Sequence, residues 1–320
     1  MRLGAMTSGF LDRPLRDAAR RLHELGVKYV EIPAGGFFPQ VHCDPEKLLS
    51  DSAALDEFQQ TLAEFDLTIS AYAMHGQPLN PDPAVVENYK RQFRAACTLA
   101  EKTGVDRFTV QAGLPAAAEG DTVPNWLLFP FPPQYVQCLQ WQWDERVIPF
   151  WREHAKIAAD HGVRVCVEMC PADVVYNPEA LLRLRDAIGP DIGANLDPSH
   201  FFWQGIDPIE AIRLLGDAIY YVHAKDSRVD SHVTRRQGLL DPTPFTDLIH
   251  RSWLFRTVGY GHGEDFWREF ISTLRLVGYD DVVSIEHEDP LIDPDEGFAS
   301  AVETLQRVMI EKPAGALWDA

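Results

Sequence analysis

The chain has 320 residues, of which 46% are hydrophobic, so it can bury a large core in two domains or in one large α/β domain. Its 48 acidic residues outnumber 29 lysines and arginines, which gives a formal net charge of -19. Because this charge repels phosphate backbones, we expect no nucleic-acid partner. The sequence contains no apolar stretch approaching the ~18 residues of a membrane span, and its amino terminus lacks the apolar core of a signal peptide. We therefore expect a soluble, cytoplasmic protein without a membrane partner.

The chain alternates compact apolar runs with segments whose apolar residues recur every three or four positions, which predicts eight strand and helix units. Strands are predicted near residues 3–9, 27–33, 67–74, 106–113, 163–169, 192–197, 219–226 and 281–289. Helices are predicted near residues 13–25, 45–65, 83–103, 143–161, 178–188, 208–216, 263–277 and 295–310. The pattern predicts a single (β/α)8 TIM barrel domain over residues 1–320.

Glycines and cysteines add two local predictions. Four glycines stand where helices should end in a left-handed residue: Gly26, Gly104, Gly162 and Gly278. The five cysteines form no CxxC pair, although Cys166 and Cys170 flank Glu168. We interpret the cysteines as buried, reduced thiols rather than as redox groups or zinc ligands.

Two connections exceed the usual length of about two to six residues, namely 114–142 after the fourth strand and 227–260 after the seventh. Both follow strands, so both should lie on the catalytic face of the barrel. The first is rich in Trp, Phe and Pro. Such loops cover an apolar part of a substrate or pack against another subunit, and we favour the subunit contact, which predicts a homo-oligomer.

Three carboxylates and one imidazole stand at or next to the downstream ends of the last four predicted strands: Glu168, Asp197, His223 and Glu286. The downstream ends of successive strands in a parallel barrel surround one ring, so these side chains should converge. Any one alone would be no more than a surface acid or a hydrogen-bonded histidine. Together they would repel one another or be poorly solvated without a cation. Their donors favour Mn²⁺, and Mg²⁺, Co²⁺ or Zn²⁺ also fit.

The strings CVEMCP, NLDPSHFFWQGIDP, HAKDSR and SIEHEDP resemble the sugar phosphate isomerase and epimerase family, the xylose isomerase-like TIM barrels of the AP endonuclease 2 superfamily. The resemblance covers nearly the whole chain. It implies that the four residues above bind one divalent metal ion. It also implies that Glu168 and Glu286 act as acid and base on opposite sides of the substrate, and that His200 contacts a substrate oxygen.

This site predicts α-proton chemistry. A metal ion bound to a sugar carbonyl and the neighbouring hydroxyl stabilises the enediolate that forms when a base removes the α-proton. One glutamate serves as the base. Return of the proton by the other glutamate inverts the carbon, whereas its transfer to the adjacent carbon interconverts aldose and ketose. The sequence therefore predicts a divalent-metal-dependent sugar isomerase or epimerase.

Several other polar or aromatic residues are candidates for substrate binding. His75 and His42 follow predicted strands and would bind substrate, act as a second base or simply cap a loop. Lys225 and Asp226 would orient substrate hydroxyls or form a local ion pair. Trp203 would stack on a sugar face or pack in the core.

A glycine-rich segment precedes the seventh helix. The glycines of VGYGHGED, at residues 258–265, would let the backbone approach a ligand in the region where TIM barrels often hold phosphate. Because the chain has no P-loop lysine and no strong basic cluster, a phosphorylated substrate is not required.

An alternative keeps the metal ion and changes the product. In a 3-keto-glycoside, loss of the proton beside the ketone expels the group at C1 by β-elimination, so the protein would be a lyase or deglycosidase for C- or O-glycosides. Some relatives associated with this chemistry work with a small partner subunit. The aromatic 114–142 connection would suit a flat aglycone, and His42 or His75 would be the base.

Two further alternatives are weaker. An apurinic endonuclease-like hydrolase needs additional metal ligands and a basic groove. Here Gln111 stands where such enzymes need a histidine, Asp230 and His232 match their further ligands only loosely, and the chain is acidic. A sugar-binding barrel without turnover would have no reason to keep both glutamates in the ligand set.

Overall fold

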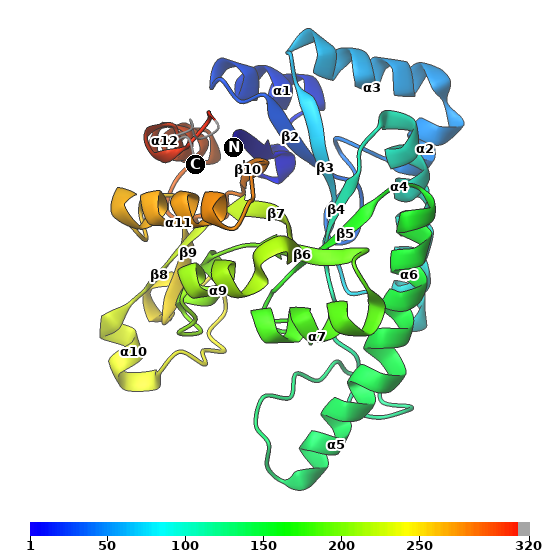
Figure 1. The fold of residues 1–320 in the computed structure, drawn as a ribbon, viewed down its shortest axis with the longest axis vertical. Helices are drawn as coiled ribbons and strands as arrows, with labels where there is room; N and C mark the ends of the chain where they lie inside the picture. The colour runs from blue at the N-terminus through cyan, green and yellow to red at the C-terminus, as the bar shows by residue number, and fades with distance from the viewer. Residues whose placement is uncertain (313–320) are drawn as a thin grey trace, which may run out of the picture.

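The computed structural model describes residues 1–312, and in it eight parallel strands close into a barrel surrounded by helices (Figure 1). The barrel strands are β1 (Arg2–Met6), β2 (Tyr29–Pro33), β3 (Thr68–Met74), β4 (Arg107–Gln111), β5 (Arg164–Glu168), β6 (Ile192–Leu196), β7 (Ile219–Ala224) and β10 (Val282–Ile285). The ring closes where β10 pairs with β1, with Val283 opposite Leu3. The predicted TIM barrel is confirmed. Residues 313–320 of the predicted domain lie outside the described residues.

The helices follow the predicted order. They are α1 (Leu15–Glu24), α2 (Pro45–Ser50), α3 (Ser52–Glu64), α4 (Pro83–Thr103), α5 (Pro133–Trp141), α6 (Ile148–Asp160), α7 (Pro178–Ile188), α8 (Ser199–Phe202), α9 (Pro208–Leu215), α10 (Ser231–Gln237), α11 (Glu264–Leu276) and α12 (Pro294–Val308). The four predicted helix-ending glycines all have a positive φ, between 73° and 92°. Within residues 1–312, none of these helices has the length and apolar composition that a membrane crossing needs.

The helix predicted over residues 45–65 is two helices, because Asp51 interrupts it. Asp51 is extended, with φ at -127°, and its carboxylate accepts hydrogen bonds from the amides of Ala53 and Ala54. The residue therefore ends α2 and caps the first turn of α3.

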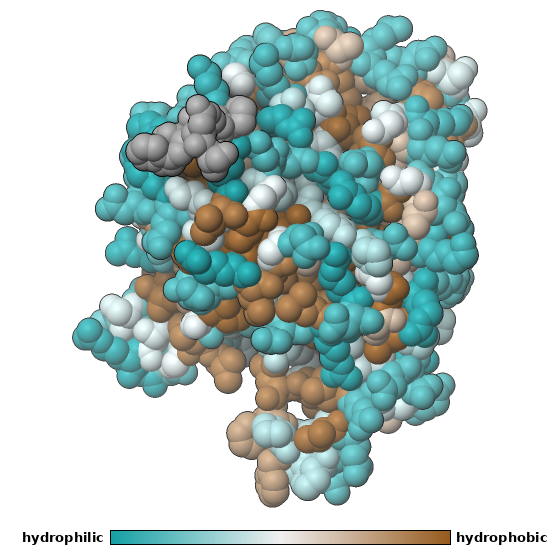
Figure 2. All heavy atoms as spheres, viewed as in Figure 1, coloured by the Kyte–Doolittle hydropathy of each residue, from teal (hydrophilic) through white to brown (hydrophobic). Residues whose placement is uncertain are grey.

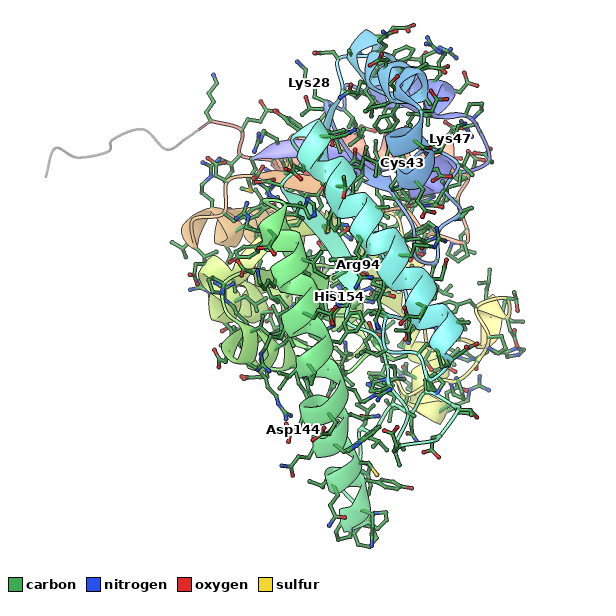
Figure 3. All side chains as sticks on the ribbon, turned by 90° about the vertical axis from the view of Figure 1, so that its right-hand side faces the viewer. Lys28, Cys43, Lys47, Arg94, Asp144 and His154 are labelled. Atoms are coloured by element: carbon green, nitrogen blue, oxygen red, sulfur yellow. The ribbon has the colours of Figure 1, made fainter. Side chains whose placement is uncertain are left out.

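The first long connection is partly helical, so the prediction of a loop as far as residue 142 is wrong. The helix α5 begins at Pro133 and continues through a π-helical turn, Gln142–Val147, into α6. Proline is compatible with the first turn of a helix, which explains why the proline-rich sequence does not prevent this start. Figure 3 shows α6 running beside α4, and the π-helical turn with Asp144 continues it past the barrel. We call residues 123–136 at its outer end the arm.

The second long connection contains its own small sheet. The strands β8 (Asp226–Val229) and β9 (Trp253–Arg256) pair in antiparallel fashion, with Ser227 opposite Phe255. The helix α10 lies between them in the sequence. The apolar side chains of β9 are thereby held in place close to the carboxyl end of β7.

The interior of the barrel changes from apolar to polar along the strands. A buried apolar cluster joins Ala71, Cys166, Tyr221 and Val282, which come from four different barrel strands. Two residues further along three of these strands lie Glu168, His223 and Ser284, all buried. Side chains two apart in a strand point to the same side, so the alternation that fills the barrel also directs these polar groups to its carboxyl end.

All five cysteines are free, as predicted. Cys43, Cys97 and Cys166 are buried, whereas Cys138 and Cys170 are partly exposed. The prediction of burial is therefore wrong for the last two, because Cys138 lies on the protruding α5 and Cys170 lies in the turn after β5.

The helix α11 offers a matched test of its packing against the rest of the fold. Leu274 is fully buried, and Leu276 in the same helix is 68% exposed. Leu274→Ala should lower the free energy of unfolding by about 2–5 kcal/mol, because it leaves a cavity. Leu276→Ala should change it by no more than about 0.5 kcal/mol. Urea unfolding followed by circular dichroism measures both, and equal losses would contradict the packing of α11.

Candidate metal centre

The four predicted metal ligands converge at the carboxyl end of the barrel. One donor atom from each of Glu168, Asp197, His223 and Glu286 lies within 4.8 Å of the others, and all four residues are buried. The Nδ1 atom of His223 lies 3.0 Å from Oε2 of Glu168 and 3.0 Å from Oε2 of Glu286. Because β5, β6, β7 and β10 are neighbours in the barrel, residues far apart in the sequence form one cluster, which we call the quartet.

Asp197 shows that the quartet fits a cation. Its Oδ1 accepts a hydrogen bond from the Ser199 amide at 2.8 Å, but its buried Oδ2 has no hydrogen-bond partner among the described residues. The nearest cationic atoms are Nε2 of His200 at 3.4 Å and Nζ of Lys225 at 3.7 Å. Burial raises the pKa of the Asp197 carboxyl. A cation held by these oxygen and nitrogen donors would offset the free-energy cost of burying this oxygen without a hydrogen bond.

The two glutamates of the quartet remain ionised. Burial opposes ionisation of Glu286, but Lys225 and His223 outweigh it and lower the pKa of the carboxyl to about 2. Burial also opposes ionisation of Glu168, but the charge of His75 and hydrogen bonds from His200 and His223 hold its pKa well below the usual range. Both groups are therefore carboxylates at neutral pH, the form that binds a cation or accepts a proton.

Glu31 orients the histidine of the quartet, and the sequence reasoning missed it. Its side chain on β2 is fully buried, and its Oε2 lies 2.9 Å from Nε2 of His223 and accepts a hydrogen bond from Ser284 Oγ at 3.0 Å. A carboxylate behind a ligating histidine fixes the orientation of the ring and leaves the other nitrogen for the metal ion. The available signal was a single acid inside the apolar run VKYVEIP.

Asn195 is a second residue that the sequence reasoning missed. It lies on β6, two residues before Asp197, and its Nδ2 donates a hydrogen bond to Oε2 of Glu168 at 2.9 Å. A polar residue within the predicted strand DIGANLD was the signal. This hydrogen bond helps to fix the orientation of the Glu168 carboxylate within the quartet.

Three predicted substrate-binding residues lie at the quartet. His75 Nε2 is 3.1 Å from Oε2 of Glu168, and His200 Nε2 is 3.1 Å from Oε1 of the same carboxylate. Lys225 Nζ lies 3.1 Å from Oε2 of Glu286 and also pairs with Glu288. The ion pairs of Lys225 are thus with acids distant in the sequence rather than a local pair with Asp226. All three residues line the same cavity.

Trp203 is a packed wall of this cavity. Its ring is stacked on that of Trp253 from β9, with ring centroids 4.7 Å apart and planes 3° apart. It is buried and lines the cavity. The face against Trp253 is therefore not available for stacking on a sugar.

His42 does not lie at the quartet. Its Nε2 is 2.9 Å from the carbonyl oxygen of Arg13, and the residue lines a separate cavity together with Cys43 and Lys47. Figure 3 places Cys43 and Lys47 near α2, on the outside of the barrel. The idea that His42 binds substrate or serves as a base is wrong, because its ring packs against the chain before α1.

Asp226 and the glycine-rich segment bind each other. One carboxylate oxygen of Asp226 accepts hydrogen bonds from the amides of Gly259, Gly261 and His262 at 3.2, 3.0 and 2.8 Å. A Cβ atom on Gly261 would lie 2.4 Å from this carboxylate. These three amides and the Asp226 carboxylate thus bind each other, so neither is free to bind a substrate at the quartet.

Within residues 1–312, the three positions weighed as additional nuclease ligands add no acid or histidine to the quartet. Asp230 caps α10 by accepting hydrogen bonds from the amides of His232 and Val233, and His232 is exposed. Gln111 lines the cavity in place of a histidine.

The cavity above the quartet has a volume of about 590 Å³ and two kinds of wall. Glu168, His200, Lys225 and Glu286 line its polar part. Its aromatic residues, besides Trp203, are Phe37, Phe38, Trp126, Phe245, Trp253 and Phe255. Of these, only Trp126 comes from the first long connection, and three come from the second. Sites with a few polar groups and a larger apolar wall bind small molecules.

The family model described as xylose isomerase-like TIM barrel matches residues 19–308. The chain belongs to this family. A relative from Bacillus subtilis (strain 168), the uncharacterized protein YfiH, is 36% identical over 312 residues, which cover 97% of this chain and 99% of the relative.

Two solved structures share the fold of this xylose isomerase-like barrel. The IOLI protein with a binding zinc atom has a TM-score of 0.66 at 19% identity, over 96% of this chain and 98% of that chain. A D-psicose 3-epimerase in the presence of D-fructose has a TM-score of 0.61 at 14% identity, over 97% of this chain and 99% of that chain. Proteins with this fold thus include a metal-binding protein and a sugar epimerase.

Glu31→Gln should lower the affinity for Mn²⁺ or Zn²⁺ by about 10–100-fold, because it removes the charge that orients His223 while keeping all four ligands. Isothermal titration calorimetry measures this affinity. The matched control is Glu57→Gln, which changes an exposed glutamate on α3 and should leave the affinity unchanged. An unchanged affinity in the Glu31 variant would show that this contact does not support the site.

Proposed function

We propose that the protein is a divalent-metal-dependent sugar isomerase or epimerase that works by α-proton abstraction. The observation that carries the proposal is the pair of carboxylates Glu168 and Glu286. They come from different strands, approach the same nitrogen of His223 and both line the cavity. Two ionised carboxylates at one cavity provide the groups that a proton transfer between two positions of a substrate needs.

The four residues of the quartet have two proposed roles, cation binding and proton transfer. Glu168, Asp197, His223 and Glu286 hold the cation, for which we propose Mn²⁺. When bound, the cation would offset the negative charge that develops on the substrate oxygens as the proton leaves. One glutamate accepts the α-proton, and the other, once protonated from solvent, donates a proton to the product carbon.

The neighbours of Glu168 position it and the substrate. His75 and His200 each place Nε2 3.1 Å from one of its oxygens, so they fix the plane of the carboxylate and reach the cavity. Lys225 pairs with Glu286 in the same way. We propose that His75, His200 and Lys225 bind the oxygens of a small sugar, while Trp203 closes the wall beside them.

The aromatic wall favours one alternative, a metal-dependent lyase or deglycosidase that cleaves 3-keto-glycosides by β-elimination. Trp126, Phe245 and Phe255 line the cavity that the quartet faces, and a flat aglycone would pack against such rings. In this reaction His75 is the candidate base, since His42 lies elsewhere. A small partner subunit would belong to this alternative.

Isotope exchange separates the two reactions. The Mn²⁺-loaded protein is incubated in D₂O with a panel of ketoses and 3-keto-glycosides, and NMR and mass spectrometry follow deuterium incorporation and aglycone release. Deuterium at the carbon next to the carbonyl without release is the expected result. Aglycone release identifies the lyase, and a metal-loaded protein that neither exchanges nor releases contradicts both.

Glu168→Gln and Glu286→Gln should each abolish turnover, because each removes a proton-transfer group. Metal analysis of the purified variants separates lost proton transfer from lost metal binding. The matched control is Glu269→Gln, an exposed glutamate on α11, which should keep full activity. Full activity in either quartet variant would rule out the proposed roles.

We also propose a homo-oligomer that buries the arm. Phe129 and Phe131 are 70% and 67% exposed, and hydrophobic residues gather at the lower end of the molecule in Figure 2, where Figure 1 shows the region of α5. Light scattering coupled to size-exclusion chromatography should give more than one subunit for the natural chain. Phe129→Ser with Phe131→Ser should give the monomer mass, and a monomeric natural chain would contradict the proposal.

A further inference from the structure

Arg251 is the one buried arginine among residues 1–312. The residue is 2% exposed and lies in the second long connection, two positions before β9. It lines the cavity above the quartet together with Phe245 and Trp253. The proposed proton transfer gives this cation no role, although it belongs to the wall of the same cavity.

The charge of Arg251 has no paired acid in the described part of the chain. Arg251 forms no salt bridge within residues 1–312, whereas Lys225, the buried lysine of the same cavity, pairs with Glu286 and Glu288. Burial lowers the pKa of Arg251, but a guanidinium stays charged near neutral pH. A buried charge without an opposite charge costs free energy, and an anion in the cavity would offset this cost.

Asp241 lines the cavity too, and its charge acts on Arg251. Its carboxylate is directed to the backbone instead. Oδ1 accepts a hydrogen bond from the Thr243 amide at 2.9 Å, and Oδ2 accepts one from the Ser252 amide at 2.6 Å. Asp241 therefore fixes the turn in which it lies and leaves the guanidinium without a paired carboxylate.

The guanidinium of Arg251 is held in a fixed orientation. Its Nε donates a hydrogen bond to the carbonyl oxygen of Trp253 at 3.2 Å, and its Nη1 donates one to the carbonyl oxygen of Thr243. Its central carbon lies 3.9 Å from the ring centroid of Phe245 and 4.7 Å from that of Trp253. Nη2 makes no hydrogen bond within residues 1–312, so its N–H groups remain for a ligand. A guanidinium held in this way is preorganised to bind an oxyanion.

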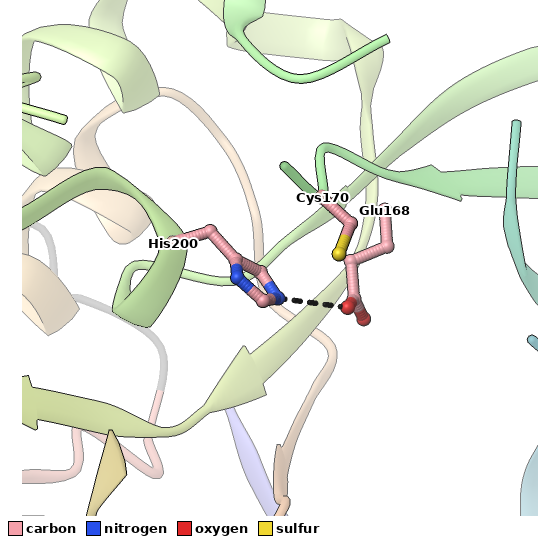
Figure 4. A group of neighbouring side chains, drawn as sticks. All are labelled: Glu168, Cys170 and His200. Atoms are coloured by element: carbon pink, nitrogen blue, oxygen red, sulfur yellow. Dashed lines mark hydrogen bonds and ion pairs between the residues drawn. The ribbon is translucent and has the colours of Figure 1, made fainter. Parts of the chain in front are cut away.

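Arg251 and the quartet belong to different parts of one cavity. Glu168 and His200 mark the reacting part, and Figure 4 shows them side by side, with His200 bonded to Glu168. The ring centroid of Phe255 lies 5.6 Å from that of His200 and 6.1 Å from that of Phe245, over which Arg251 lies. Because Arg251 and Glu168 line one cavity of about 590 Å³, a single small molecule can contact both.

We propose that Arg251 binds the carboxylate of an acidic sugar whose carbonyl end lies at the quartet. This rests on the proposed function, because it narrows the substrate of the same site from sugars in general to sugar acids. Arg251 is then the residue that distinguishes an acidic sugar from its neutral counterpart. The substrate carboxylate supplies the opposite charge that residues 1–312 do not pair with Arg251.

A carboxylate suits this site better than a phosphate. A carboxylate carries one negative charge, which one guanidinium balances, whereas a phosphate monoester carries about 1.5–2 negative charges near neutral pH. The excess charge would face the carboxylates of Asp241 and Glu288, which line the same cavity. Two of the three nitrogens of Arg251 are already bonded to carbonyl oxygens, so few donors remain for the three oxygens of a phosphate.

Matched sugars test the role of Arg251. D-fructuronate differs from D-fructose only at C6, where a carboxylate replaces the hydroxymethyl group, and D-tagaturonate differs from D-tagatose in the same way. Isothermal titration calorimetry gives the affinity of the Mn²⁺-loaded protein for each sugar, and NMR in D₂O gives the rate of deuterium exchange. Each acid should bind about 10–100-fold more tightly than its neutral partner, because it gains a charge-assisted hydrogen bond.

Three variants assign this preference to its residue. Arg251→Gln should remove the preference by weakening the binding of the acids alone, and Arg251→Lys, which keeps the charge, should restore part of it. Arg236→Gln removes the same charge from an exposed position on α10 and should keep the natural preference. An arginine that only holds the turn in place would weaken both sugars of a pair alike, so the ratio of the two affinities is the deciding measurement.

The outcomes separate the role of Arg251 from the proposed function. Equal affinities within both pairs of the natural chain, or no binding of either acid, overturn the role of Arg251, while exchange on the neutral ketoses keeps the function standing. A preference for the acids that survives Arg251→Gln also overturns it. Tighter binding of D-fructose 6-phosphate than of D-fructuronate overturns the assignment of a carboxylate. An acid preference that depends on Arg251, without exchange on any sugar, supports the role of Arg251 and contradicts the function.

Discussion

Four carboxylates are buried where the barrel ends, and their mutual repulsion is the constraint on which the site depends. Burial alone would lower the pKa of the His75, His200 and His223 imidazoles, but the carboxylates raise all three above the usual range. Protons on these rings and the ammonium of Lys225 supply the compensating charge of the protein itself. A divalent cation would take over this compensation and return the imidazoles to the neutral form that binds metals.

The barrel supplies a rigid floor for this cluster. Glu31 ties His223 to β2 and, through Ser284, to β10, so strands from opposite ends of the sequence hold one ring. The quartet is therefore fixed by backbone pairing rather than by flexible loops. The long connections supply the walls instead, because Trp126 and the aromatic residues around β9 line the cavity. The proposed metal ligands and most of the aromatic wall thus belong to different parts of the chain.

Much of the fold could be predicted from local pattern. The helices at 83–103 and 178–188 begin and end as predicted, because each begins with a proline after a capping residue, Asp82 or Asn177. The errors arose where local signals compete. Asp51 lies within a helical pattern of apolar residues, but its side chain caps a new helix and so interrupts the pattern. The aromatic, proline-rich sequence before residue 142 forms a helix that its composition did not suggest.

The sequence by itself determined the eight strand and helix units and the residue types at the strand ends. In a closed parallel barrel all strands end on the same face, so the side chains at these ends must point towards one another. The barrel and the four members of the quartet could therefore be predicted. Only the tertiary structure decided which other polar groups join them. Glu31 and Asn195 come to the site, whereas His42 and Asp226 are bound by their own loops. The reason is that hydrogen-bond partners of a loop side chain depend on contacts between distant segments, which local periodicity does not record.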